Sequence, residues 1–348
     1  MSKIIKKRDA GIENLSKNFN FNISNSNNIK NSEIKTINTD DKNAYIEKNS
    51  YTNDVLENII ELFGFDKPTI DDGHELLRDN SIWYSKDEIK SVEKRGPNNE
   101  NIIVIMNNGE EFVFVPNSDG DGYILNNIIL SDGTSISCAL PESRQQEIRE
   151  LAEIDDEVPI KGWASIEIDG HQTYVYWVGD ASCDFEAFKT QVGNVKNALD
   201  RMPSNVLEQI FSNNNFKGFF VGAYYSSSYR ENDYNAFALQ DNYIYINTHQ
   251  NASYETILHE LGHIYDFTLG DGNSHYSVSS STINQYYSKY GEVIKDLIPT
   301  NSGYHFTGPT NSTEFFACVF QIYLVKPEEL KQLVPELYIF MDDLVKNT

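Results

Sequence analysis

The sequence is poor in cysteine, in long apolar runs and in positive charge, and each shortage excludes a class of protein. Its 348 residues contain 3 cysteines, placed far apart, which excludes a disulfide-dense scaffold and a local cysteine metal cluster. No apolar run approaches the roughly 18 residues that a membrane helix needs, so we expect no stable membrane insertion. The basic opening MSKIIKKRDAG has no hydrophobic stretch behind it, so we expect any export to proceed without a classical signal peptide.

Acidic residues outnumber basic residues by 52 to 28, which gives a net charge of −24. Affinity for nucleic acid comes mainly from counterions that Lys and Arg displace from phosphates, so most of this surface would repel a nucleic acid. We therefore expect no nucleic-acid partner. A basic peptide or protein would be attracted, although acidic surfaces often serve only to keep a protein in solution.

The chain divides into three regions by composition. At 39% hydrophobic residues it can bury one large core or two medium ones. Residues 1–50 are rich in Asn, Ser and Lys without a sustained period, which predicts a flexible leader that is either without a task or an export signal. Residues 51–180 are expected to form a β-rich accessory region with short helices, beginning with a helix near 55–63. Residues 181–348 are expected to form the main domain.

The accessory region contains two pairs of apolar segments separated by turn sequences. Residues 102–106 and 112–115 flank Asn107-Asn108-Gly109, and residues 163–168 and 173–178 flank Asp169-Gly170. Both turns predict β-hairpins, and a helix is expected near 141–153. The last region shows a helix near 185–201, strands near 216–224, 235–239 and 243–247, and then helices. This order is typical of an α+β domain.

A partial calcium-loop pattern lies in the accessory region. Asn117, Asp119, Asp121 and Gly122 match its first half, in which alternating oxygens surround a hard cation. Position twelve, which should be a bidentate glutamate, is Ile128, and the flanking segments resemble strands rather than helices. We therefore expect a polar hairpin turn at Asp119 and Asp121 instead of a calcium site.

The pattern HELGH at residues 259–263 lies within an amphipathic helical segment, 254–269. Ser253 is suited to cap its N-terminus, and Gly270 follows its last turn. Residues four apart lie one above the other on a helix, so His259 and His263 present two imidazoles on one face. Two such imidazoles are the ligands that a tetrahedral zinc ion takes from one helix.

Glu260 lies one position round the helix from the first histidine. It can stand beside the metal without binding it, accept a proton from the attacking water and pass it to the leaving amine. The implied reaction is hydrolysis of an amide bond. The alternative, two surface histidines on an ordinary helix, would be a chance occurrence of the pattern.

A catalytic zinc site needs a third protein ligand and one open position. Asp266, one turn beyond His263, is one candidate, and Glu314 is the other, because Asn311 or Ser312 can cap a second helix that begins there. We favour Glu314, which approaches the metal from a separate helix. Asp266 is better suited to accept an imidazole N–H and fix its tautomer, or it is a solvated surface acid.

HELGHIYD followed by TNSTEFFACVF is similar to the catalytic domain of anthrax toxin lethal factor and to the bacterial Pro-Pro endopeptidases. The resemblance covers the C-terminal part of the chain. It implies a zincin-like metalloprotease domain with a mixed sheet and an active-site helix. The residues that match the family's motifs are His259, His263 and Glu314 as ligands of one catalytic Zn²⁺ ion, and Glu260 as catalytic base.

Two positions depart from the family. The family has an oxyanion-stabilising tyrosine a few residues before the third ligand, where the ungapped position here is Thr307. Tyr304 would fit with a short insertion and is our candidate for that catalytic role, with His305 and a structural tyrosine as alternatives. Cys318 stands one turn after Glu314, where the resemblance leads us to expect an acid. We interpret it as a buried, inert thiol.

The strand near 235–239 precedes the motif helix, and we expect a peptide substrate to pair with it as an added strand. Tyr224, Tyr225 and Tyr229 would either line the substrate pockets or pack in the core.

These features predict a zinc-dependent endopeptidase, acting as a secreted or translocated bacterial toxin or virulence effector that cleaves a host or extracellular protein. The alternative is a degenerate zincin that serves a toxin as a non-catalytic binding module. If residues 1–50 are an export signal and not a terminus without a task, delivery machinery or a pore partner would recognise them.

Overall fold

The computed structural model describes residues 88–116, 118, 123–152, 158, 160–179, 185–212, 216–222, 235–239, 242–248, 252–270, 274–298 and 308–347. The chain forms two compact units, the first ending at Leu140 and the second beginning at Pro141. It is a mixed α+β protein, as the sequence predicts. The expected leader at 1–50 and the helix near 55–63 lie outside the described residues, as do Asn117, Asp119 and Asp121 of the calcium-like segment.

The described part of the first unit is an antiparallel sheet. Its strands, each paired with the next, are β1 (Ile89–Arg95), β2 (Asn101–Met106), β3 (Glu111–Pro116), β4 (Tyr123–Ile129) and β5 (Ser135–Ser137). The predicted hairpin of β2 and β3 is confirmed, and Gly109 adopts φ +90° in its turn, where glycine avoids the strain of a side chain. Ile128 is fully buried in β4, so its side chain belongs to the core of this sheet.

The second unit contains a mixed set of strands. In spatial order they are β6 (Ile160–Ile168), β7 (His171–Val178), β8 (Gly218–Gly222), β10 (Tyr243–Asn247) and β9 (Ala236–Leu239). The β6–β7 hairpin is antiparallel as predicted, β7, β8 and β10 run parallel, and β9 is antiparallel to β10. Every residue of β8 and β10 is buried, which is typical of parallel strands covered on both faces.

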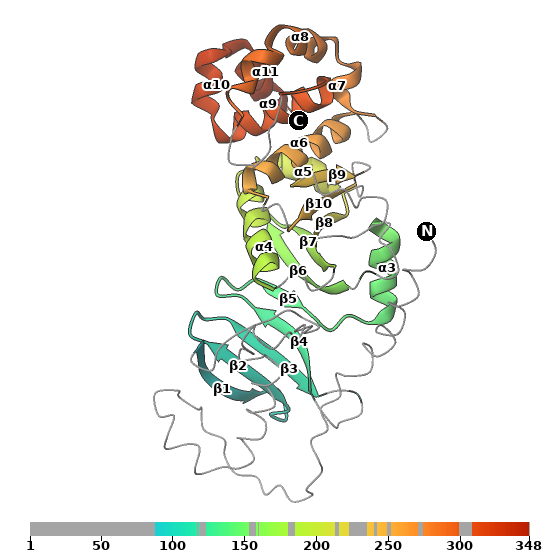
Figure 1. The fold of residues 1–348 in the computed structure, drawn as a ribbon, viewed down its shortest axis with the longest axis vertical. Helices are drawn as coiled ribbons and strands as arrows, with labels where there is room; N and C mark the ends of the chain where they lie inside the picture. The colour runs from blue at the N-terminus through green and yellow to red at the C-terminus, as the bar shows by residue number, and fades with distance from the viewer. Residues whose placement is uncertain are drawn as a thin grey trace, which may run out of the picture. The chain divides into compact units, whose positions relative to one another are not determined.

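The helices of this unit cover the strands and extend beyond them. They are α3 (Glu142–Ala152), α4 (Phe185–Leu199), α5 (Ser204–Ser212), α6 (Tyr254–Leu269), α7 (Tyr276–Ser279), α8 (Ser281–Lys295), α9 (Ser312–Val325), α10 (Pro327–Leu333) and α11 (Pro335–Asn347). Figure 1 shows α6 between the strands β8 to β10 and the C-terminal helices α7 to α11. Within the described part of the chain, no helix is both long and apolar enough to cross a bilayer.

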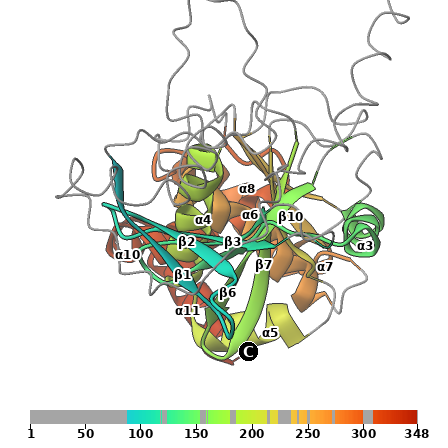
Figure 2. The same ribbon diagram turned by 90° about the horizontal axis from the view of Figure 1, so that it is seen from below.

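Aromatic side chains fix α3 and α4 on opposite faces of the β6–β7 hairpin. Trp177 stacks on Phe188 of α4, with ring centroids 5.0 Å apart. On the other face, the guanidinium of Arg144 in α3 lies 5.1 Å from the ring centre of Trp163. Figure 2 shows the two helices on either side of these strands. Because both faces are covered by helices, the hairpin is part of the core of the second unit.

The structure therefore places β6 and β7 in the second unit, whereas the sequence grouped residues up to 180 with the accessory region. The reason is the parallel pairing of β7 with β8, in which Val175 lies opposite Phe219. A hairpin is a local pattern, and its sequence does not reveal which further strand its outer edge will join.

Candidate metal centre

Helix α6 carries two candidate metal ligands on one face. Its N-terminus is capped as predicted, since the Ser253 hydroxyl accepts a hydrogen bond from the backbone N–H of Thr256 at 3.4 Å. His259 and His263 are 9% and 8% exposed, so both imidazoles are withdrawn from bulk water. Their rings lie with centroids 4.9 Å apart and planes at 86°, as expected for side chains on successive turns.

Helix α9 supplies the third candidate ligand from its first turn. Asn311 is the N-cap, and its side-chain oxygen accepts hydrogen bonds from the backbone N–H groups of Thr313 and Glu314 at 2.9 Å each. A carboxylate in the first turn is favoured by the partial positive charge of the helix N-terminus. The cap thus fixes the start of α9 and with it the backbone position of Glu314.

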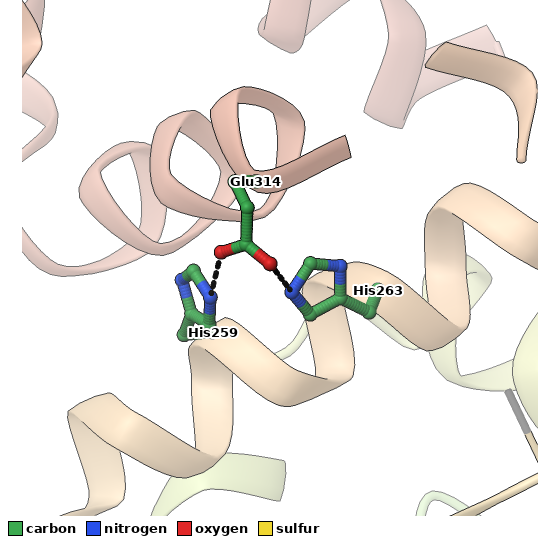
Figure 3. Close-up of side chains that lie close together, drawn as sticks. All are labelled: His259, His263 and Glu314. Carbon is green, nitrogen blue, oxygen red and sulfur yellow. Dashed lines mark ion pairs between the residues drawn. The ribbon is translucent and has the colours of Figure 1, made fainter. Parts of the chain in front are cut away.

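The three side chains converge as zinc ligands would. The Nε2 atom of His259 is 3.3 Å from Glu314 Oε2, and the Nε2 atom of His263 is 3.5 Å from Glu314 Oε1 (Figure 3). All three ligand atoms lie within 4.8 Å of one another. Two ligand atoms at about 2.05 Å from a tetrahedral zinc ion are about 3.3 Å apart, which is close to each of the two nitrogen–oxygen distances, so the three side chains can hold such an ion once they draw closer together.

A close contact between α6 and α9 makes this convergence possible. A Cβ atom added to Gly262 would lie 2.9 Å from the Cα of Ala317, closer than such atoms approach in proteins. The helices are also tied by the side chain of Gln321, which donates to the backbone carbonyl of Glu255 at 2.8 Å. Gly262, between the two histidines, and Ala317, three residues after Glu314, are therefore small enough to let the two helix backbones approach each other.

Glu260 is hydrogen-bonded to strand β9. Its Oε2 atom accepts a hydrogen bond from the backbone N–H of Ala238 at 2.8 Å. Burial raises the pKa of Glu260 to about 7, although His259 and the Ala238 hydrogen bond oppose the shift. A carboxyl group with this pKa can exchange a proton near neutral pH, as a general base must.

The electrostatics of the three candidate ligands differ. Burial and the neighbouring His259 lower the pKa of His263 to about 3, so this imidazole is neutral. Burial opposes the protonation of His259 too, but the nearby Cys318, Glu314 and Glu260 outweigh it and hold the pKa of His259 well above its usual value. Burial also opposes the ionisation of Glu314, but its hydrogen bond with His259 lowers the pKa of this carboxyl. A divalent cation binding here would displace the proton of His259.

Asp266 does not lie on the metal. It is fully buried, which corrects the interpretation as a solvated surface acid. Its two oxygens accept hydrogen bonds from the backbone N–H and the hydroxyl of Ser277, at 2.8 and 2.6 Å, and Oδ2 is 3.3 Å from Nδ1 of His275. The imidazole that Asp266 approaches is that of His275, outside the motif, and not that of a candidate ligand. Asp266 thereby anchors the start of α7 against α6.

His275 lies at the site, although no sequence pattern pointed to it. It is the N-cap residue of α7, but its side chain makes no capping hydrogen bond. Its ring lies beside His263, with centroids 6.4 Å apart, and Ser277, two residues on, is 3.5 Å from the hydroxyl of Thr313. A single histidine in a loop carries no spacing signal, so only the fold brings it to the site.

Cys318 is buried, as expected, but it is not isolated. Its sulfur lies 3.8 Å from Nδ1 of His259, the ring nitrogen opposite the one that faces Glu314. Burial raises the pKa of the Cys318 thiol, although its contact with His259 opposes the shift. The position at which the sequence comparison led us to expect an acid is therefore filled by a thiol in contact with a candidate ligand.

Several predicted site residues lie outside the described residues. They are Tyr304, the candidate oxyanion stabiliser, its alternatives His305 and Thr307, and the pocket candidates Tyr224, Tyr225 and Tyr229.

No protein-family model matches the chain, and no curated protein matches it. The likeness to the lethal-factor group thus rests on the two motifs and their placement on α6 and α9.

Proposed function

We propose that the chain is a zinc-dependent endopeptidase and that its second unit is a zincin-like metalloprotease domain. The observation that carries this proposal is the convergence of one ligand atom each from His259, His263 and Glu314 within 4.8 Å of one another, with Glu260 next to the first histidine. Two imidazoles and one carboxylate leave a fourth position for reactants, which is the composition of catalytic rather than structural zinc sites.

The chemistry divides between the metal and the chain. When bound, zinc lowers the pKa of water and polarises the substrate carbonyl. Glu260 accepts the proton of the attacking water and then delivers it to the leaving amine nitrogen. The Ala238 N–H holds the Glu260 carboxylate in place, and its pKa of about 7 in the metal-free protein suits a group that must both take up and release a proton. Tyr304 remains our candidate for stabilising the oxyanion.

Strand β9 is the proposed docking edge for a peptide. In the sheet order it is the last of the described strands of the second unit. The backbone N–H of Ala238 donates a hydrogen bond to Glu260 and not to β10. In an antiparallel strand the N–H and C=O of one residue point the same way, so Ala236 and Ala238 direct their polar groups away from β10. A peptide paired there as an added strand would lie beside Glu260. The net charge of −24 favours a basic peptide.

Metal analysis combined with a peptide-library digest tests the proposal. The wild-type protein should bind one zinc ion per chain and cleave library peptides. Glu260→Gln should bind the same amount of zinc and lose at least about a hundredfold in cleavage rate, because the base is gone while the ligands remain. Equal cleavage by both proteins would refute the mechanism. Stoichiometric zinc without cleavage of any peptide by the wild type would support the alternative, a degenerate zincin that binds a partner.

We also propose that the protein acts as a toxin or virulence effector that is secreted or translocated. Residues 1–50 would then be recognised by delivery machinery or a pore partner. The support is the motif resemblance to secreted toxins and the basic, Asn-rich composition of this segment. Deleting residues 1–50 should abolish export and leave peptide cleavage intact. Loss of both properties, or of neither, would contradict a delivery role.

A further inference from the structure

The thiol of Cys318 occupies the place next to a candidate metal ligand where proteins commonly have an oxygen acceptor. Helix α9 presents Glu314 and Cys318 from successive turns of one face, so both point toward His259 of α6. Glu314 lies 3.3 Å from Nε2 of that imidazole and the sulfur lies 3.8 Å from Nδ1. The ring is therefore contacted at both nitrogens by the same helix.

This arrangement determines the tautomer of His259 in the metal-bound state. A metal held here would bind the lone pair of Nε2, because that nitrogen faces Glu314. A neutral imidazole then carries its hydrogen on Nδ1, and that N–H points at the sulfur of Cys318. The contact distance lies within the range of N–H···S hydrogen bonds.

We propose that Cys318 is a positioning residue of the metal centre, which accepts a hydrogen bond from Nδ1–H of His259 and so holds Nε2 toward the metal. The inference rests on the metal centre of the proposed function. It assigns a task to a thiol that the sequence marks only as buried and inert. Partners that orient a ligand imidazole in this way typically contribute tenfold to a hundredfold to metal affinity.

The neighbouring packing supports a fixed position for the sulfur. Cys318 is fully buried, and the residue before it, Ala317, is in contact with Gly262 of α6. Close packing around a fully buried side chain restricts rotation of the sulfur away from His259. A fixed acceptor loses no side-chain entropy when the metal binds, which makes a weak hydrogen bond effective.

Zinc affinity measured by competition with a chromophoric chelator tests the proposal on three full-length variants. Cys318→Ala removes the acceptor, and we expect zinc affinity to fall by about tenfold or more. Cys318→Ser keeps an acceptor of similar size, and its affinity should stay within about threefold of wild type. Val319→Ala is the matched control, because it opens a cavity at the next buried position of α9. It should lower the melting temperature but leave zinc affinity within about threefold.

Two outcomes would overturn the proposal. The first is a Cys318→Ala variant whose zinc affinity equals that of the wild type, or one that loses no more than Val319→Ala. The second is a sulfur-to-metal charge-transfer band in the cobalt-substituted protein that vanishes in Cys318→Ala, since this would make the sulfur a ligand. The two proposals can fail separately, because the role of Cys318 is tested by zinc affinity and the endopeptidase by peptide cleavage. A wild type that binds zinc but cleaves no peptide would refute the endopeptidase, and the zinc affinities of the variants would still decide the role of Cys318.

Discussion

Among single residues, Glu260 determines how activity should depend on pH. Its pKa of about 7 in the metal-free protein is raised by burial, and a bound dication lowers it again. Only the carboxylate form accepts a proton, so kcat/KM should fall as the pH drops through this pKa. We expect an acidic limb with its midpoint at or below about pH 7 and a loss of about tenfold per pH unit below it. Cleavage rates measured with zinc content checked at each pH test this. A rate that rises toward acid would contradict it.

Asp266 is expected to be important for stability. It is fully buried and accepts two hydrogen bonds from Ser277. In Asp266→Asn the amide nitrogen replaces one acceptor and the charge facing His275 is lost, so the free energy of unfolding should fall by about 2–4 kcal/mol. Denaturant unfolding of the zinc-free protein measures this, with the exposed Asp343→Asn as control, which should change it by less than about 0.5 kcal/mol. Equal effects of the two substitutions would contradict the assigned role.

The sequence identifies those candidate site residues whose geometry is local. His259, Glu260 and His263 follow from helical spacing, and Glu314 follows from a capped helix that could approach from elsewhere. The sequence could not show that Asp266 contacts His275, because this contact depends on how the chain folds between α6 and α7. The contact of Cys318 was missed for the same reason, since it joins two helices.

Among the elements, the α6–α9 crossing is the contact on which the site depends. In Gly262→Ala the new methyl group would lie 2.9 Å from the Cα of Ala317, and backbone cannot rotate aside as a flexible side chain can. We expect α9 to shift outward, so zinc affinity should fall by about tenfold and the free energy of unfolding by about 1–3 kcal/mol, despite the better helix propensity of alanine.

Gly193→Ala is the matched control for this prediction. Gly193 is also inside a helix, α4, but a Cβ atom there meets nothing within 4 Å. This substitution should raise stability by about 0.5–1 kcal/mol and leave zinc affinity unchanged. A Gly262→Ala variant that behaves like Gly193→Ala would show that the helices do not need their close contact.

Elements were predictable where their pattern is short-range. The hairpins, β10, α3, α4, α6 and α9 follow from turn residues, caps and periodicity. The order of the strands follows only in part. Residues 235–239 were expected to accept a peptide as an added strand, and β9 is indeed the last strand in the order, but nothing in the sequence indicated that the other edge of β7 pairs with β8. This pairing is long-range, and only the packing of buried strands decides it.

For the whole molecule, the metal should stabilise the fold. A ligand that binds only the folded state adds about 2.7 kcal/mol when its concentration is a hundred times its Kd. We therefore expect zinc to raise the melting temperature and a chelator to lower it. In His263→Ala, which removes one of the three ligands, this difference should disappear. A wild-type melting temperature that is the same with zinc and with chelator would contradict a preformed site.

The most direct test of the central claim is X-ray absorption spectroscopy of the zinc-loaded protein. The account predicts one zinc ion per chain in a shell of nitrogen and oxygen atoms at about 2.0–2.2 Å, with the scattering signature of two imidazoles. In Glu314→Ala the imidazole signature should persist in whatever zinc remains. Substoichiometric zinc in the wild type, a shell with fewer than two imidazoles, or sulfur at about 2.3 Å would contradict it.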